Sequence, residues 1–461
     1  MSVPSAPGRL PLLGHALALL RDPIALLQSI RAHGDIVAIR IGPLDVYVLN
    51  APELVRQILV ADADRYRKGR FYEKFRPYQG DGLFTVDGQR HQKQRRLLSP
   101  AFQRARLAAY AEVMRACAEQ RSARWRPHAA LDVRAEMYAL AGDVVARVLF
   151  GSGLDTAGTA TIHRWLPVFI TGMGRRVVSP AAWLDRIPTP ANRRFDESRR
   201  RLHTVVGELI AAHRPGGPDL LGLLLQARDD DGTPMDPAQV RDEVLTFLTA
   251  GIETVSTTLT WLYHELGRHP QVERRLLAER DEVLGERPVT FDDLPRLAYC
   301  RDVVRETLRL HSPAWMLMRR PVEPVQLGGV RFAAGTELLC SPATLHRDPA
   351  LYPRPTQFDP DRWAQADRRA PAYLPFSAGP YRCLGEQFAL TELVTVVATI
   401  GARWRLAPAR DRAPREVAGA ALAPDRLRMV AVPRPSDPGP ARPREEEDRG
   451  TTCSAPSRRP T

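Results

Sequence analysis

The segment PFSAGPYRCLG, residues 375–385, places Cys383 between two glycines and directly before an apolar stretch that predicts a helix from about residue 385 to 400. Backbone N–H groups at a helix N-terminus lower the pKa of a nearby thiol, so we expect Cys383 to be a thiolate. Gly379 and Gly385 leave room for a flat cofactor to approach the backbone, and Phe376 can keep water from the sulfur. Taken alone, a single cysteine is more often a small buried core residue.

A second segment, TAGIET at residues 249–254, lies in the middle of a long helix predicted from Asp236 to about Arg268. Gly251 costs about 1 kcal/mol relative to alanine inside a helix, so its presence calls for a reason. A local kink and polar notch there could hold dioxygen and a chain of waters. The alternative is that Thr254 bonds back to a helix carbonyl while the neighbouring acid is solvated.

Two further segments pair charged residues at helical spacing. Glu306 and Arg309 lie three residues apart, and FDPDRW at residues 358–363 contributes Arg362 to the same region of the chain. His91 and Arg95 lie four residues apart and share one face of a predicted helix. Taken alone, such pairs are usually surface contacts, and a basic helix face is often simply solvated.

In their order and spacing, the four segments resemble the cytochrome P450 family, whose haem-binding loop reads F-x-x-G-x-R-x-C-x-G. The matching positions are Phe376, Gly379, Cys383 and Gly385. Tyr381 stands where the family has the arginine, with Arg382 one residue later, and other members place histidine there. The resemblance covers roughly residues 7–433, and the opening segment and the loop are most similar to terpene-oxidising, soluble bacterial members. It implies a mainly α fold with a small β region, built as a triangular helical prism around a buried haem with a long central helix.

The resemblance also implies roles for individual residues. Cys383 would be the axial thiolate ligand of the iron in haem b, while Glu253 and Thr254 would relay protons to dioxygen. The expected cofactor-binding residues are His91, Arg95, Ala250, Gly251, Arg319, Phe376, Gly379, Tyr381, Arg382 and Gly385. Arg320 is an alternative to Arg319 for binding a haem propionate. Glu306, Arg309 and Arg362 would form a buried structural cluster.

The composition is that of a globular enzyme. The formal net charge is +13, but the basic residues are scattered, which argues against nucleic-acid binding and favours one basic face for an acidic partner. The five cysteines are widely spaced without a CxxC pair, so neither a disulfide framework nor a zinc site is expected. The N-terminus shows no export signal or membrane span, so a cytoplasmic protein is expected. We expect one haem-binding domain over residues 1–433 and a disordered tail over residues 434–461.

The expected activity is insertion of one oxygen atom from O2 into an unactivated C–H bond. No dinucleotide-binding motif is visible, so NAD(P)H electrons would come through a ferredoxin and its ferredoxin reductase. The alternatives are another haem-thiolate outcome (epoxidation, phenol coupling or peroxide-driven oxidation) and a non-catalytic all-α binding protein. The expected pocket segments are Phe71–Phe84, Phe169–Met173 and Pro313–Met318, together with Phe247 on the long helix. These segments favour a neutral hydrophobic substrate, preferably a cyclic terpene, over an acid held by Arg76.

Overall fold

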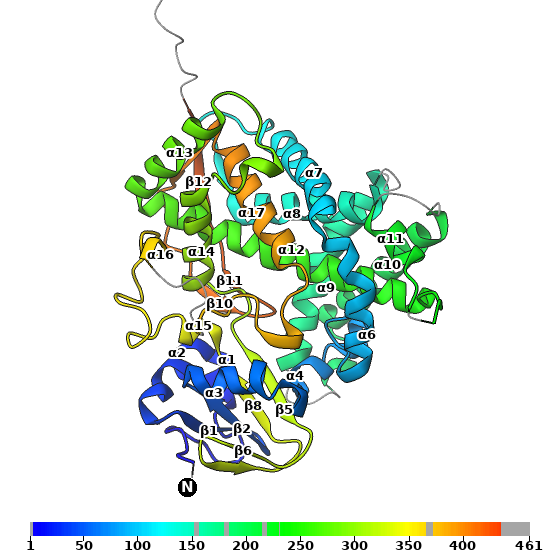
Figure 1. Cartoon of the computed structure of the whole chain (residues 1–461), viewed down its shortest axis with the longest axis vertical. Coiled ribbons are helices and arrows are strands. Elements are labelled where there is room, and N and C mark those ends of the chain that lie inside the picture. Colours follow the sequence, from blue (N-terminus) through cyan, green and yellow to red (C-terminus); the bar gives the residue numbers. More distant parts are fainter. Residues whose placement is uncertain are drawn as a thin grey trace, which may run out of the picture.

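The structure is a computed structural model, and it describes residues 3–151, 156–178, 184–213, 219–229, 231–365 and 372–434. Figure 1 shows a helical part above and a smaller β-rich part below, with α12 (Pro237–Arg268) crossing the middle of the molecule. The other long helices are α6 (Gly88–Leu98), α7 (Arg104–Ser122), α8 (Val133–Phe150), α9 (Thr156–Val178), α10 (Pro190–Ala212), α13 (Pro270–Leu284), α14 (Ala298–Leu310) and α17 (Glu386–Ile400).

The short helices mostly connect these elements to the sheets. They are α1 (Ala16–Arg21), α2 (Pro23–Ser29), α3 (Pro52–Arg56), α4 (Arg70–Glu73), α5 (Arg76–Gln79), α11 (Leu220–Gln226), α15 (Pro342–Leu345) and α16 (Arg362–Gln365).

The main sheet has the strand order β1-β2-β8-β5-β3. Its strands are β1 (Ile36–Ile41), β2 (Leu44–Leu49), β3 (Tyr66–Lys68), β5 (Leu317–Pro321) and β8 (Glu337–Cys340). β1 and β2 form an antiparallel hairpin, in which Ile36 pairs with Leu49. β2 and β8 pair in parallel, and this joins the start of the chain to the segment that follows α14.

Three smaller sheets complete the β structure. They are β4 (Ala130–Asp132) with β12 (Arg428–Pro433) and β9 (Trp404–Pro408), the pair β6 (Val325–Leu327) and β7 (Val330–Phe332), and the pair β10 (Glu416–Ala418) and β11 (Leu422–Pro424).

The local signals that predict α12 act as expected. The side chain of Asp236 accepts a hydrogen bond from the backbone N–H of Ala238, and Pro237 occupies the first helical turn. With 32 residues the helix is roughly 48 Å long, enough to cross the whole helical part. Most of its large apolar residues, such as Val244, Leu248 and Ile252, are buried in the main core. The mainly α fold with small sheets, expected from the sequence, is therefore confirmed.

No helix within the described ranges is long and apolar enough to cross a membrane. The division into one domain and a disordered tail stays a prediction, because residues 435–461 lie outside the described residues. Arg434 is described and is held in place, since its backbone N–H donates to the carbonyl of Arg403 and its guanidinium to Asp281.

Candidate active site

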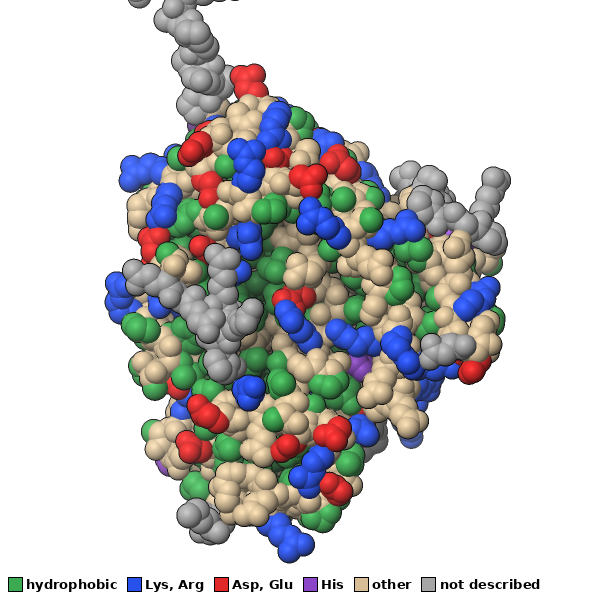
Figure 2. Space-filling view, in the orientation of Figure 1, with side chains coloured by type: hydrophobic (Ala, Val, Ile, Leu, Met, Phe, Trp, Pro, Cys, Tyr) green, Lys and Arg blue, Asp and Glu red, His purple; other side chains and the backbone are tan. Residues whose placement is uncertain are grey.

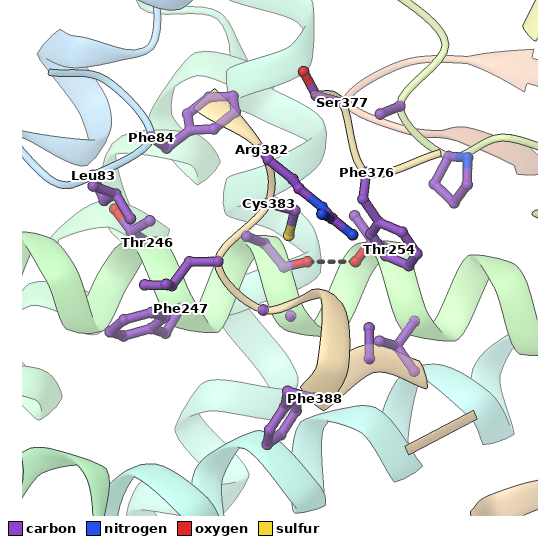
Figure 3. Close-up of a pocket in the computed structure, with 18 of the residues that line it drawn as sticks. Leu83, Phe84, Thr246, Phe247, Thr254, Phe376, Ser377, Arg382, Cys383 and Phe388 are labelled. Carbon is purple, nitrogen blue, oxygen red and sulfur yellow. Dashed lines mark hydrogen bonds between the residues drawn. The ribbon is translucent and has the colours of Figure 1, made fainter. Parts of the chain in front are cut away.

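A cavity of about 340 Å³ lies in the centre of the molecule, beneath the middle of α12. Its walls come from α12, from the segment before β5, from the loop that follows α5 and from the loop of residues 375–385. Figure 3 shows the sulfur of Cys383 directed into this space, with Phe376 and Thr254 near it and Leu83 and Phe84 on another side. The structure thus brings together segments that are more than 250 residues apart in the sequence.

The loop of residues 375–385 holds Cys383 by its backbone. The N–H of Cys383 donates to the carbonyl of Phe376 (2.9 Å), which turns the chain so that both side chains face the cavity. Burial raises the pKa of the Cys383 thiol, and the N–H of Gly385 and the guanidinium of Arg95 only oppose this. The backbone N–H of Gly385, at the start of α17, acts in the expected direction, and the thiolate form of Cys383 stays a prediction. A bound metal cation would deprotonate the thiol, because coordination favours the anion strongly.

The two glycines of the loop have different surroundings. Gly379 has φ +68°, and a Cβ at this position would lie 1.8 Å from the carbonyl oxygen of Leu59. Gly379 therefore lets the loop pack on the Leu59 backbone, and it does not line the cavity, contrary to the expected role beside a flat cofactor. Gly385 does line the cavity, and a Cβ at this position would lie 4.0 Å from the sulfur of Cys383.

Tyr381 forms the centre of a polar corner of the cavity. Its hydroxyl donates a short hydrogen bond to Asp87, and burial together with this bond raises the pKa of Tyr381 to about 12. The ring of His91 lies 4.7 Å from the tyrosine ring, and the guanidinium of Arg319 lies 4.8 Å from its centroid. Because its hydroxyl is bonded to Asp87, Tyr381 is poorly placed to replace the arginine that the family has at this position.

The cations of this corner come mainly from outside the loop. Arg319 lines the cavity, whereas Arg320 pairs with Glu73 and Glu337 and does not, so Arg319 is the residue that faces the site. Arg95 also lines the cavity, and its guanidinium donates to the carbonyl of Arg382 (2.6 Å).

The other two basic residues of the corner, His91 and Arg382, differ from these arginines. Burial, with help from the neighbouring cations, lowers the pKa of His91 to about 3, so this ring is neutral near pH 7. Arg382 lines the cavity too, but its guanidinium is half exposed and pairs with Glu386.

The donor set fits haem. Arg319 is only 2% exposed, and no carboxylate of the described ranges pairs with its guanidinium, whose hydrogen-bond acceptor is the carbonyl of Met318. A buried guanidinium without a counter-ion is costly, so an acidic group is expected to bind beside it. A flat apolar ring with acidic groups at one edge matches a cavity that has a thiol on one wall and cations at one corner. When bound, haem with a thiolate ligand supplies the electron density that favours cleavage of the O–O bond of dioxygen.

The middle of α12 forms the wall that carries the expected proton-relay residues. Phe247, Ala250, Gly251 and Thr254 all line the cavity, as the helical spacing predicts. The hydroxyl of Thr254 donates to the carbonyl of Ala250 (2.7 Å), so Thr254 makes the intrahelical bond and faces the cavity at the same time (Figure 3).

Glu253 lies on another side of α12 and does not line the cavity. Burial raises the pKa of its carboxyl, and the charge of Arg134 on α8 only partly opposes this. Glu253 is therefore neither in the cavity nor on a solvated face. A proton that passes from its carboxyl to Thr254 would need an intervening carrier such as water.

The remaining walls of the cavity are mostly apolar. The segment before β5 contributes Pro313, Ala314, Trp315, Met316 and Leu317, and the expected Phe71–Phe84 segment contributes Phe71, Tyr72, Leu83 and Phe84. Met318 is buried outside the cavity in a core cluster with Trp315.

One expectation about the pocket is wrong, and the alternative in which Arg76 holds an acid is not supported. Residues Phe169–Met173 of α9 belong to the core, where the ring of Phe169 stacks on Phe195, and none of them lines the cavity. Arg76 does not reach inward to hold an acid, because its guanidinium pairs with Asp81 and is more than half exposed.

Glu306 is the centre of a charge cluster in which Glu306 and Arg309 are fully buried. Its carboxylate accepts two bonds from Arg309 (2.8 and 2.9 Å) and one from Arg362 (2.9 Å). The indole N–H of Trp363 and the backbone N–H of Asp359 complete the set of donors. The cluster joins α14 to α16. Both oxygens of the Glu306 carboxylate have hydrogen-bond donors, which is the condition under which a buried charge is tolerated.

Sequence reasoning missed Lys68 and Asp87. Lys68 lines the cavity beside Tyr381, and its backbone N–H donates to Asp87 (2.6 Å). Burial lowers the pKa of Lys68 to about 7. The sequence contains one signal for Lys68. The chain holds few lysines, and this one stands between Arg67 and Gly69 in a short strand.

Comparison with known proteins gives a consistent result. A family model described as "Cytochrome P450" matches residues 4–429. "Cyclooctat-9-en-7-ol 5-monooxygenase" of Streptomyces melanosporofaciens is 42% identical and covers 88% of this chain and 89% of its own length. "Pentalenene oxygenase" of Streptomyces avermitilis is 39% identical, with coverage of 93% and 97%. Among solved structures, the haem domain of cytochrome P450DA superposes with a TM-score of 0.83 at 26% identity and covers 94% of this chain and 98% of its own.

Proposed function

The chain belongs to the cytochrome P450 family as a haem-thiolate monooxygenase, and on this premise we propose that it hydroxylates an unactivated C–H bond of a neutral cyclic terpenoid. The observation that carries the proposal is the apolar wall facing Cys383. The side chains there are Phe71, Phe84, Phe247, Trp315, Met316 and Leu317, and none is charged. Such a wall binds ligands by apolar burial, about 25 cal/mol per Å², and offers no group to fix a carboxylate or an amine.

The two relatives named above support the substrate class, since both are terpenoid oxygenases that align along most of this chain. The aromatic side chains of the wall support it as well. Phe84 is held edge-on by Tyr72 and Phe75, with ring centroids 5.2 and 5.3 Å apart. A rigid aromatic wall suits a compact polycyclic ligand better than a flexible chain, because a chain would lose more conformational entropy on binding.

The proposal assigns roles to the residues of the site. Cys383 would bind the haem iron through its sulfur, and Arg95, Arg319 and His91 would bind the acidic edge of the haem. Ala250 and Gly251 would leave space for the haem beside α12. The hydroxyl of Thr254, which donates to the carbonyl of Ala250, would pass on protons at the cavity wall that Glu253 supplies through water. Phe376 shields the sulfur, and Glu306, Arg309 and Arg362 hold the segment that leads into the haem-binding loop.

We further propose an acidic ferredoxin with its NAD(P)H-dependent reductase as the electron donor. Figure 2 shows Lys and Arg side chains gathered across the middle of one face, where the loop before α17 lies in Figure 1. Arg96 and Arg382 are exposed residues of α6 and of this loop. Arg382 directly precedes Cys383, and Arg96 follows Arg95, which donates to the carbonyl of Arg382, so an acidic partner docked here would be near the haem.

The test is a substrate-binding screen of the haem-loaded protein by the change in iron spin state. We expect cyclic terpenes and their alcohols to give saturable low-to-high-spin shifts, and fatty acids to bind weakly. The product of the best ligand, formed with NAD(P)H, ferredoxin and reductase, should carry one added hydroxyl oxygen derived from O2. Tight spin shifts with fatty acids, absent for every cyclic terpene, would overturn the proposal.

A further inference from the structure

Leu83 and Phe84 form one part of the cavity wall that lies on a loop and not on a regular element. The loop runs between α5 and α6, and hydrogen bonds within it are short-range, such as those from the hydroxyl of Thr85 to the carbonyls of Gly80 and Gly82. Loops of this kind usually move unless something outside them holds the backbone. In this protein buried ionisable side chains hold it, and two of them bond to the backbone of Leu83.

Glu243 is the first of these side chains. It lies on α12 with its side chain completely buried, and one carboxyl oxygen accepts the backbone N–H of Leu83 (2.9 Å). The other oxygen has no hydrogen-bond partner in the part of the chain that the structure describes. The catalytic roles assigned above leave Glu243 without a function, although burying an ionisable group so completely is costly.

Lys68 holds the other backbone polar group of Leu83. Its ammonium donates to the carbonyl oxygens of Leu83 (2.7 Å) and Phe84 (2.9 Å), and the residue is only 8% exposed. Leu83 therefore has its N–H bonded to a side chain of α12 and its carbonyl bonded to a side chain of β3. These bonds fix both polar groups of one wall residue, and this leaves its apolar side chain facing the cavity.

The adjoining residues let the loop lie directly on α12. Asp242 accepts the backbone N–H of Asp81 (2.8 Å), two residues before the bond to Leu83. A Cβ on Gly80 would lie 2.1 Å from the Asp242 carboxylate, and one on Gly82 would lie 2.2 Å from the hydroxyl oxygen of Thr246. Only glycine can bring the backbone this close to the helix. The two glycines and the hydrogen bond from Asp81 to Asp242 therefore keep this loop in direct contact with α12.

We propose that Glu243 is a positioning residue for substrate: with Lys68 it clamps the Leu83–Phe84 peptide, and the clamp sets the shape of the cavity wall and the affinity for a rigid ligand. Glu243 does not touch the substrate. It acts through Leu83 and Phe84, which do line the cavity. The proposal rests on the proposed function for the identity of the natural ligand, but the clamp itself is a property of the loop.

The test uses the haem-loaded full-length protein and two substitutions at one position. In Glu243→Gln the amide oxygen can still accept the Leu83 N–H, so hydrogen exchange of residues 79–85 and ligand affinity should stay near wild-type values. In Glu243→Leu the N–H loses its acceptor, so exchange in this segment should accelerate roughly tenfold or more. The dissociation constant for the best cyclic terpenoid should rise by a similar factor.

A matched control and a second ligand separate this proposal from its premises. Val244→Ala shortens the neighbouring fully buried side chain of α12 without removing a loop hydrogen bond, and it should leave exchange of residues 79–85 unchanged. Phenylimidazole binds haem iron directly, so its affinity reports on the same cavity wall without depending on terpenoid binding. Its affinity should also fall in Glu243→Leu and recover in Glu243→Gln.

The outcomes divide clearly. If no terpenoid binds the wild-type protein, the proposed function fails. Hydrogen exchange of residues 79–85 and the affinity for phenylimidazole then still test whether Glu243 holds the loop. Unchanged exchange in Glu243→Leu overturns the clamp, and so does faster exchange with unchanged affinity for both ligands. Equal losses in Glu243→Gln and Glu243→Leu would also contradict it, because they would show that the hydrogen bond to Leu83 is not what matters.

Discussion

Thr254 combines a cavity-facing hydroxyl with a bond to the Ala250 carbonyl, and this geometry defines what its removal should do. Thr254→Ala removes a donor near the iron without changing the fold of α12. We expect the variant to consume NAD(P)H while the fraction that yields hydroxylated product falls roughly tenfold or more, with the balance released as hydrogen peroxide. Product and peroxide are measured per NAD(P)H consumed. Thr254→Ser keeps the hydroxyl and is the control, and unchanged coupling in Thr254→Ala would remove this residue from proton delivery.

Glu243 gives a prediction about pH. Burial raises the pKa of its carboxyl from 4.5 to about 8, so between these values the folded protein retains a proton that the unfolded chain releases. Folding therefore takes up a proton in this range, so the contribution of this carboxyl to the free energy of unfolding falls as the pH rises from 4.5 to 8. Above pH 8 that destabilising contribution is constant. Glu243→Gln should remove the effect. Its free energy of unfolding relative to wild type, measured in urea, should therefore increase with pH across this window, and a pH-independent difference would contradict the assignment.

Residue identity predicted some of the site and not the rest. Cys383, Thr254 and Arg95 face the cavity as their spacing predicts, because loop and helix geometry fix side-chain direction locally. The choice between Arg319 and Arg320 could not be made from the sequence, since adjacent strand residues point to opposite faces and nothing local shows which face is the cavity. The role of Gly379 was also beyond reach, because it depends on the backbone of Leu59, far away in the chain.

At the scale of elements, the Glu306 cluster should dominate stability. Arg362→Leu removes one of the two guanidinium partners and leaves a fully buried carboxylate undercompensated, which typically costs about 3–5 kcal/mol. Chemical denaturation of the haem-loaded protein measures this loss. Arg275→Leu is the control, since its pair with Asp361 is more than half exposed at both ends and should contribute less than about 1 kcal/mol. Similar losses in the two variants would contradict the structural role of the cluster.

Elements with strong local signals were predictable. The β1–β2 hairpin, the capped start of α12 and the strands β6, β7 and β8 follow from alternation, turn residues and an N-cap. The placement of α9 did not follow, because helical periodicity shows that a face is buried but not whether a core or a cavity covers it. Its residues Phe169 and Met173 are buried in the core against α10, and a contact between two helices has no signature in either sequence segment.

At the scale of the whole molecule, the net charge of +13 and the exposed arginines near Cys383 predict salt-sensitive electron transfer. The rate of reduction by an acidic ferredoxin should fall as ionic strength rises, since exposed charges are screened beyond about 8–10 Å at 0.1–0.15 M salt. Stopped-flow reduction across a salt series measures this. Arg96→Glu should weaken the salt dependence, whereas Arg200→Glu on α10 is the control on another exposed helix. A rate that does not change with salt would exclude electrostatic docking.

The central claim is that Cys383 is the thiolate ligand of a haem in this cavity. The measurement that tests it most directly is the absorption spectrum of the reduced, carbon monoxide-bound protein, for wild type and for Cys383→Ser. The wild-type spectrum should show the strongly red-shifted Soret band that thiolate ligation produces. Cys383→Ser should lose that band while its far-UV circular dichroism still shows a folded helical protein. A red-shifted band that survives in Cys383→Ser, or that disappears only when Cys300 or Cys340 is replaced, would contradict the account.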